Sequence, residues 1–275
     1  MSNSTLAFLG GGNMARALVD GLLQHGWKAA DIRVADPDPA AREYLCSRHP
    51  GLVVMEDNQA VVQGAATWLL AVKPQQARDV VMPLRRLAEA GRPLVISIAA
   101  GIRAGDLSAW LGGKAPVVRC MPNRPAVLRS GITALYARPD VDAALRGRAA
   151  VVMGAVGECV WLDDESLMDA VTAVSGSGPA YVFLLIEMLE AAARAEGIEP
   201  GTARRLAIET LFGAARMARE GNEDPAVMRA QVTSRGGTTA AALDVLERAG
   251  IRDTFIEAIH AATLRSRELA RESGS

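Results

Sequence analysis

The sequence predicts an α/β domain with a doubly wound, mostly parallel sheet, followed by an all-helical domain. Three observations predict this arrangement. Strand-like and helix-like segments alternate through the first 163 residues, and only helix-like segments follow them. A glycine-rich turn joins the first strand-like segment to the first helix-like one. The length of 275 residues suits two domains or one large one. Because the strand signal stops at about Asp164, we place a boundary between residues 163 and 164.

The glycine-rich turn follows an apolar run and reads Gly10-Gly11-Gly12-Asn13-Met14-Ala15. It matches the pattern Gly-x-Gly-x-x-Ala, in which the first glycine permits a tight turn and the second lets a pyrophosphate approach the backbone. The following helix offers free N–H groups and a partial positive charge to the phosphates. Asp36 ends the next strand-like run, 32–35, about 20 residues beyond Ala15, as the dinucleotide fingerprint requires. We therefore predict a Rossmann domain that binds a dinucleotide.

The remaining elements of this domain alternate in the same way. Strands are expected at 52–55, 67–72, 93–98, 116–121, 131–136 and 159–162. Helices are expected at 40–48, 75–88, 104–111 and 141–153. In such a sheet, ligands bind beyond the carboxyl ends of the strands.

Three loops at those carboxyl ends are expected to line the cofactor. They read Ala71-Val72-Lys73-Pro74, Ser97-Ile98-Ala99-Ala100-Gly101 and Arg119-Cys120-Met121-Pro122-Asn123-Arg124-Pro125. The second has side chains small enough for a ring to lie against the backbone, and two prolines stiffen the third. Plain connectors are the alternative interpretation, but three such loops at one sheet edge favour a ligand.

From about residue 164 the sequence predicts only helices, at 165–174, 179–196, 202–219, 226–232, 239–249 and 253–271. The second of these is apolar nearly all round, so it must be buried on more than one side. A helical globule of this size covers such a wide apolar belt poorly by itself. We therefore predict a homodimer that forms through this half, and a higher assembly of dimers stays open.

Two stretches interrupt the helical pattern. They read Ser175-Gly176-Ser177-Gly178-Pro179-Ala180-Tyr181 and Thr233-Ser234-Arg235-Gly236-Gly237-Thr238-Thr239, and each places small and polar residues where a helix is expected to begin. Backbone N–H groups and hydroxyls at a helix start suit a substrate carboxylate. Ordinary N-capping by serine and threonine is an equally good interpretation of either stretch.

The composition excludes several classes of protein. The 30 basic and 31 acidic residues form no basic block, which argues against a nucleic-acid partner. Cys46, Cys120 and Cys159 have no metal-ligand spacing and are typical of reduced thiols in a cytosolic protein; Cys120 is interpreted as a buried structural thiol. We find no signal peptide and no apolar run that approaches the length of a membrane span. The expected protein is cytoplasmic, without a metal and without a membrane partner.

Taken together, these segments resemble the pyrroline-5-carboxylate reductase family over almost the whole chain. The resemblance rests on residues 8–15, 71–74, 97–101, 121–123, 173–181 and 234–239. It implies a Rossmann domain followed by a helical domain that interlocks with that of a second copy. It also implies hydride transfer from NADPH or NADH to the C=N carbon of 1-pyrroline-5-carboxylate, which gives L-proline in the last step of proline biosynthesis.

The resemblance also assigns site residues. It implies a cofactor lining of Leu9, Gly10, Gly11, Gly12, Asn13, Met14, Asn58, Ala71, Val72, Lys73, Pro74, Ile98, Ala99 and Ala100. The motifs described above add Asp36 and Asn123. The substrate carboxylate would be held by Ser234, Gly236, Gly237, Thr238 and Thr239, with Thr239 as the catalytic residue, its hydroxyl near the ring nitrogen. The first interruption of the helical pattern adds Ser175 and Gly176 to the substrate site.

Two alternatives stay open from the sequence. A hydroxyacid dehydrogenase or ketopantoate reductase would use a lysine of the helical half as proton donor, but Lys114 is the last lysine of this chain. A non-catalytic NAD(P)-binding sensor is the second alternative. Arg124 and Arg235 stand where the family usually has threonine and proline. We hypothesise that they strengthen carboxylate attraction or alter which cyclic imine is accepted, and solvent exposure is the equal alternative.

Asp36 bears on the choice of cofactor. A carboxylate there accepts hydrogen bonds from a ribose 2′-hydroxyl but repels a 2′-phosphate. Family members often prefer NADPH, and Arg33 and Arg42 lie near enough in sequence to offset the repulsion. We predict that NADH is used at least comparably to NADPH.

Overall fold

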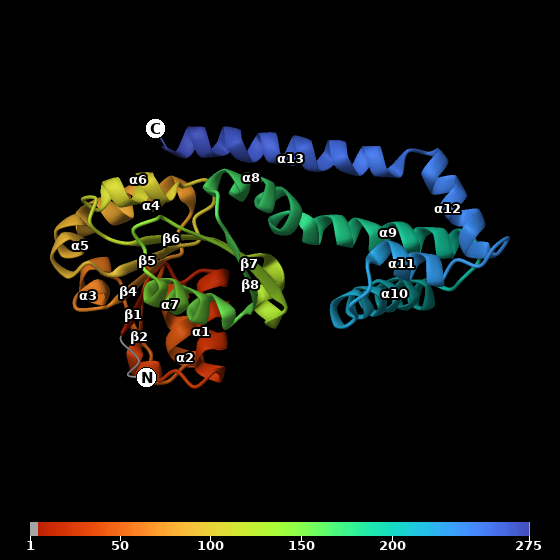
Figure 1. Ribbon diagram of the computed structural model, residues 1–275. Coiled ribbons are helices and arrows are strands. Elements are labelled where there is room, and N and C mark those ends of the chain that lie inside the picture. Colours follow the sequence, from red (N-terminus) through yellow and green to blue (C-terminus); the bar gives the residue numbers. More distant parts are fainter. Residues whose placement is uncertain (1–4, 275) are drawn as a thin grey trace. The chain divides into compact units, whose positions relative to one another are not determined.

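The computed structural model describes residues 5–274 and contains one eight-stranded sheet (Figure 1). The strand order is β3-β2-β1-β4-β5-β6-β7-β8. β1 to β6 are parallel to one another, whereas β7 is antiparallel to β6 and parallel to β8. The predicted fold class is confirmed. The strands are β1 (Leu6–Leu9), β2 (Ile32–Ala35), β3 (Val53–Met55), β4 (Thr67–Leu70), β5 (Leu94–Ser97), β6 (Val117–Met121), β7 (Gly131–Ala137) and β8 (Gly157–Leu162).

Helices cover both faces of the sheet, and each face has its own apolar core. One core joins Leu18, Leu45 and Val152 of α1, α2 and α7 to the sheet. The other joins Val61, Val81 and Leu107 of α3, α4 and α6 to the opposite face. The helices are α1 (Asn13–Gln24), α2 (Pro39–Arg48), α3 (Asn58–Val62), α4 (Pro74–Val81), α5 (Arg85–Gly91), α6 (Ala104–Trp110) and α7 (Ala143–Gly154). Short 3-10 turns are η1 (Ala29–Asp31), η2 (Met82–Leu84), η3 (Arg124–Leu128) and η4 (Glu165–Leu167).

Three helical predictions need correction. The single helix expected at 75–88 is broken into α4, η2 and α5, because Pro83 in η2 lacks the N–H that a continuous helix needs. The five-residue helix α3 was not predicted, since five residues are too few to show a period. The helix expected at 165–174 consists of η4, α8 (Met168–Val171) and the π-helical turn η5 (Thr172–Gly176).

The contacts of the chain divide it into two compact units. One unit contains the sheet, continues to Ser177 and includes the chain from Ala262 onward; the other runs from Gly178 to Ala261. This division differs from the predicted boundary after residue 163. The carboxylate of Glu165 pairs with the buried Arg119 at 3.2 Å and accepts a 2.7 Å hydrogen bond from the Ala104 amide. These bonds hold the start of the helical half against the sheet, because a buried guanidinium needs a partner.

The C-terminal part of α13 (Ile251–Gly274) also belongs to the unit of the sheet. The buried Ser266 hydroxyl donates to the buried Asp169 carboxylate at 2.8 Å. A Cβ on Gly101 would lie 3.2 Å from the Cα of Ala270, so glycine lets the helix approach this loop closely. The last helix is therefore attached to the sheet by contacts that link residues far apart in sequence.

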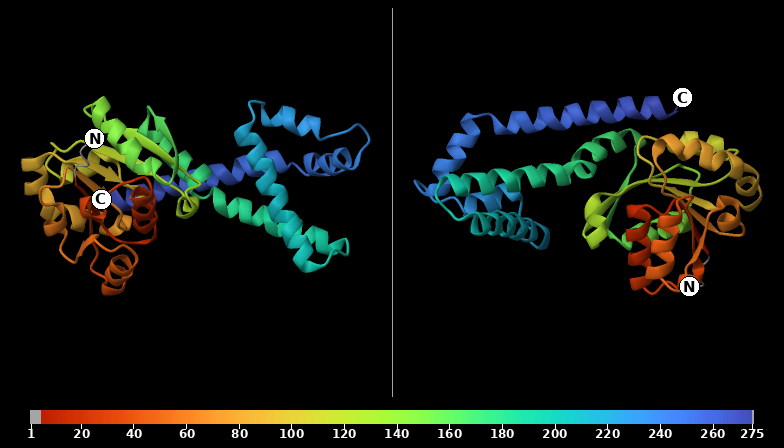
Figure 2. Two further views of the ribbon diagram at one scale, coloured as in Figure 1. Left: turned by 90° about the horizontal axis from the view of Figure 1, so that it is seen from below. Right: turned by 180° about the vertical axis from the view of Figure 1, so that it is seen from behind.

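The second unit is entirely helical, as predicted. It contains α9 (Gly178–Ala195), α10 (Pro200–Glu220), α11 (Pro225–Gln231), α12 (Thr238–Arg248) and the beginning of α13. α9 packs against α10, and Figure 2 shows this helix pair from two further directions. Large apolar side chains remain exposed on these helices, among them Phe183 at 56%, Leu184 at 54% and Phe212 at 62%. The unit therefore presents apolar surface that it does not cover itself.

The expectation that no apolar run reaches the length of a membrane span is wrong. The helical stretch Glu165–Ala195 has 31 residues and a mean hydropathy of 1.3 in its best window, which suffices by length and composition. Only 6% of that window is buried. α9 alone has 18 residues, and the helical turns that precede it extend the stretch to 31 residues.

Candidate functional site

The glycine turn lies between the ends of β2 and β4. The Gly10 amide donates to the Ala35 carbonyl and the Ala71 amide donates to the Leu9 carbonyl, both at 2.8 Å. Gly10 has a φ of +101°, and a Cβ there would lie 2.6 Å from the Ala71 carbonyl oxygen. Only glycine satisfies both the conformation and the space at this position.

The N-terminus of α1 is open. Its N-cap is Gly12, so no side chain caps the helix, and the first turn contains no acidic residue. The first helical hydrogen bond runs from the Arg16 amide to the Gly12 carbonyl at 2.9 Å, which leaves three preceding amides without an intrahelical partner. A Cβ on Gly12 would meet nothing within 4 Å. These features fit the pyrophosphate of a dinucleotide.

The Asp36 carboxylate is fixed beside this turn. One oxygen accepts from the Gly11 amide at 2.7 Å and the other from the Asp38 amide at 2.8 Å. Arg42 donates to the main-chain carbonyls of Asp36 and Pro37 and pairs with Glu56 at 3.3 Å. Arg33 donates to the Gln63 carbonyl at 2.8 Å. Neither arginine is bonded to the Asp36 carboxylate, so the charge compensation considered from sequence is not formed by these two residues.

The other expected cofactor residues follow the carboxyl ends of neighbouring parallel strands. Ala71, Val72, Ile98 and Ala100 are partly exposed, Asn13 and Lys73 are exposed, and Asn58 begins α3. Leu9 and Ala99 are 1% and 2% exposed and belong to the apolar core. For those two residues, only the main chain can contribute to a ligand site.

Asn123 has a structural partner at each end of its side-chain amide. Its oxygen accepts from the Ile132 amide at 2.9 Å, and its nitrogen donates to the Ser175 carbonyl at 3.2 Å. A Cβ on Gly176 would lie 2.8 Å from the terminal methyl of Met121. The loop after β6 is thus fastened to the π-helical turn that contains Ser175 and Gly176. The sequence predicted both segments as site elements but not this contact, since they are 52 residues apart.

The π-helical turn η5 ends at Gly176, and α9 begins at Gly178 after a bend at Ser177, so a helix does start in this stretch. The Ser175 hydroxyl donates to the Val171 carbonyl at 3.0 Å, and the Ser177 amide donates to the Thr172 carbonyl at 2.9 Å. These two donors are therefore engaged within the preceding helical turn.

The start of α12, in the second unit, is open as expected. Gly237 is the N-cap without a side-chain hydrogen bond, and its amide donates to the Ser234 carbonyl at 3.1 Å. The first helical bond runs from the Ala241 amide to the Gly237 carbonyl, so the amides of Thr238 and Thr239 have no intrahelical partner. The N-capping alternative is thus not realised here. This geometry fits a carboxylate.

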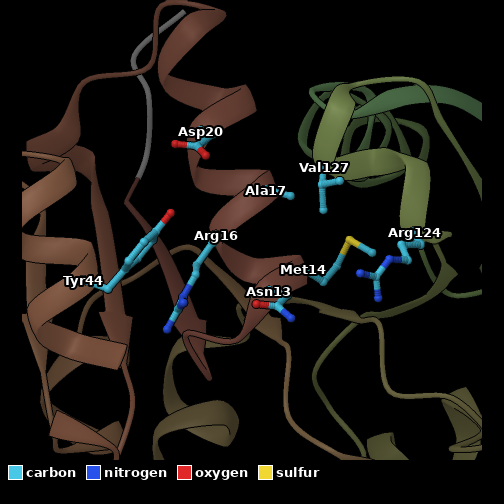
Figure 3. Close-up of a pocket in the computed structure, with 8 residues that line it drawn as sticks. All are labelled: Asn13, Met14, Arg16, Ala17, Asp20, Tyr44, Arg124 and Val127. Atoms are coloured by element: carbon cyan, nitrogen blue, oxygen red, sulfur yellow. The ribbon is translucent and has the colours of Figure 1, made fainter. Parts of the chain in front are cut away.

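A groove of about 600 Å³ follows one side of α1 (Figure 3). Arg124, which the sequence singled out, lies on its wall with Asn13 and Met14 from the first turn of α1. No hydrogen bond or ion pair of Arg124 or Arg235 is found within residues 5–274. Both side chains are exposed, and Arg124 lies on the groove wall beside the first turn of α1.

The cysteines lie as the sequence suggested. Cys120 is buried. Burial raises the pKa of its thiol well above the usual range, and the nearby Cys159 adds a smaller increase. A thiol held in its neutral form is a poor nucleophile. Within the described part of the chain, no three histidine, cysteine or acidic side chains form a metal-binding group.

The fold and the open helix start define a dinucleotide-binding protein of the Rossmann class that carries an additional helical domain. Comparison with known proteins narrows this class. Residues 165–269 match the family model described as pyrroline-5-carboxylate reductase dimerisation, and residues 5–101 match the model described as NADP oxidoreductase coenzyme F420-dependent. A pyrroline-5-carboxylate reductase of Pseudomonas aeruginosa is 45% identical over the full length of both chains.

Solved structures agree with these matches. A pyrroline-5-carboxylate reductase from Coxiella burnetii has a TM-score of 0.94 and 38% identity, and covers 98% of this chain and 99% of its own. A Plasmodium falciparum pyrroline carboxylate reductase with NADP bound has a TM-score of 0.84 and 27% identity over both whole chains. The chain belongs to the pyrroline-5-carboxylate reductase family. The predicted family and oxidoreductase class are confirmed, and the family's dimerisation domain makes the chain part of a homo-oligomer.

Substitutions of two glycines in the turn should affect stability and cofactor binding separately. Gly10→Ala should destabilise the protein by at least about 2 kcal/mol, because the alanine would be strained and would overlap Ala71. Gly12→Ala should change stability by less than about 1 kcal/mol. It should nevertheless raise the Kd for NADH about tenfold, since its methyl group would occupy the space left for the pyrophosphate. Thermal unfolding and NADH fluorescence titration measure the two effects, and unchanged NADH binding by Gly12→Ala would contradict this assignment.

Proposed function

We propose that this chain reduces 1-pyrroline-5-carboxylate to L-proline with NADH or NADPH. The full-length similarity to reductases of that name carries the proposal. Two open helix starts, at α1 and α12, support it, because a dinucleotide and an anionic imine each need an anion site. The hydroxyacid dehydrogenase alternative is disfavoured by the lack of any lysine after Lys114.

The cofactor would be held by main-chain groups of the turn at 10–14, by the Asp36 carboxylate and by the loops that follow β4 and β5. When bound, the reduced nicotinamide supplies the hydride that the imine carbon accepts. The hydrogen bonds from the Gly10 amide to the Ala35 carbonyl and from the Ala71 amide to the Leu9 carbonyl hold the turn in place. The site therefore loses little conformational freedom on binding.

The substrate carboxylate would be held by the amides of Thr238 and Thr239, with Ser234, Gly236 and Gly237 completing the turn. The Thr239 hydroxyl would lie near the ring nitrogen and keep the imine in its protonated form. A protonated cyclic imine accepts hydride readily, so alignment of two bound molecules can supply most of the rate. Such alignment contributes about 7–11 kcal/mol at best.

The proposed reaction is tested with purified protein, the imine and reduced nicotinamide, by following nicotinamide absorbance. Thr239→Val should lower kcat/KM for the imine at least about tenfold, or about 1.4 kcal/mol, and should leave the Kd for NADH unchanged. Thr210→Val, on an exposed position of α10, is the matched control and should keep full activity. Turnover of ketopantoate or hydroxyacids but not of the imine by the wild type would refute the proposal.

We propose that NADH is used at least comparably to NADPH, with kcat/KM values that differ by less than about tenfold. Two amides hold the Asp36 carboxylate, and neither Arg33 nor Arg42 is bonded to it. Because these two arginines do not neutralise its negative charge, the carboxylate would repel an incoming 2′-phosphate. Asp36→Ser should raise the NADPH-to-NADH ratio of kcat/KM about tenfold, with melting temperature as the control for loss of the turn hydrogen bonds. A wild-type ratio above about ten, or about 1.4 kcal/mol, would contradict this proposal.

We propose further that the homo-oligomer is built from dimers in the cytoplasm, without a membrane or nucleic-acid partner. The exposed apolar side chains of α9 and α10 would then be covered by a second copy rather than by lipid. Leu184→Glu should dissociate the assembly in sedimentation experiments, because it would bury an unpaired charge. Val151→Glu changes an equally exposed residue of α7 and should not do so. A wild-type protein that sediments as one chain would rule out this assembly.

A further inference from the structure

We propose that Arg124 is an affinity-determining residue for the dinucleotide, with its guanidinium bound to a cofactor phosphate at the start of α1. This inference rests on the part of the proposed function that assigns a nicotinamide cofactor. It does not depend on which imine is reduced.

The backbone of Arg124 is held in place. The residue begins η3, between Pro122 and Pro125, and the Ala126 amide closes the turn on the Asn123 carbonyl at 3.1 Å. The Asn123 side chain is itself fastened to Ile132 and Ser175. η3 packs against α1, so Arg124 is presented to that helix from a rigid support.

The Arg124 side chain lines the groove along α1 and reaches toward Met14 in the first helical turn (Figure 3). None of the hydrogen bonds or ion pairs among residues 5–274 engages its guanidinium. An arginine held this way next to open amides has five donors available for a ligand. Its planar donor fork matches a phosphate group.

The rest of the groove favours an anion as well. Arg16 stands on the opposite wall, with its Nε donating to the Gly11 carbonyl at 2.9 Å and its guanidinium 4.2 Å from the centre of the Tyr44 ring. Asp20 supplies the carboxylate of the groove. That carboxylate already lies 2.8 Å from His49 and 3.7 Å from Arg48. The uncompensated charge in the groove is therefore positive.

Two anions of the reaction could use Arg124, namely a cofactor phosphate and the substrate carboxylate. The phosphate is favoured because Asn13 and Met14, in the first turn of α1, line the groove beside Arg124. The amides of that turn are open, and the fold places a pyrophosphate there. The substrate carboxylate has a separate set of open amides at α12. Because both nicotinamide cofactors carry the pyrophosphate, Arg124 should strengthen the binding of NADH and NADPH alike.

The test measures cofactor affinity in the absence of any imine. Arg124→Thr should raise the Kd for NADH and for NADPH about tenfold, which corresponds to about 1.4 kcal/mol at 25 °C. Arg124→Lys should recover part of that loss, because it restores the charge without the fork. The affinity of Arg124→Thr should also fall less steeply with salt than that of the wild type. Arg86→Thr on α5 removes the same charge from an exposed site outside the groove and should bind as the wild type does.

An unchanged Kd for both cofactors in Arg124→Thr would overturn the inference. A raised KM for the imine at saturating NADH, with unchanged cofactor Kd, would instead assign Arg124 to the substrate carboxylate and would also overturn it. If Arg124→Thr does not fold, as judged by circular dichroism, the Kd of Arg124→Gln decides in its place. A wild type that binds NADH but leaves the imine unreduced would refute the proposed function and leave this result standing.

Discussion

The closeness of two backbone segments, at the ends of β1 and β4, is the constraint on which the nucleotide site depends. No side chain fits between Gly10 and the Ala71 carbonyl, so the chain must turn there in a conformation that glycine alone adopts without strain. That turn sends the chain into α1 with no capping side chain at its start. Unsatisfied amides are therefore left at the sheet edge, and they give the fold its affinity for phosphate.

Hydrogen bonds from distant parts of the sequence hold the rest of that edge. Arg119 is buried in the middle of β6, where an unpaired guanidinium would be costly, and Glu165 supplies both its charge partner and a cap for α6. Asn123 joins the next loop to the π-helical turn, and Ser266 holds Asp169. These contacts explain why the sheet unit includes the beginning and the end of the helical half.

The second unit follows a different physical principle. Its helices have well-formed polar starts, such as Glu199 at α10 and Asp224 at α11, but their apolar surfaces are not enclosed. A chain with so much exposed apolar area gains free energy by associating with another copy. The same surface makes the stretch Glu165–Ala195 apolar enough to resemble a membrane span by composition. The exposed apolar surface thus accounts both for the association of copies and for the high hydropathy of this stretch.

The sequence by itself determined the α/β order, the glycine turn, the position of Asp36 and the helical second half, because strand and helix periods and glycine spacing are local properties. It also identified the open start of α12 from a short polar motif. Only the tertiary structure decided that Ser175 lies in a π turn and that Asn123 binds the chain rather than standing free. It also placed Arg124 against α1. These outcomes depend on which distant backbone groups remain unpaired after packing, and no local pattern encodes that information.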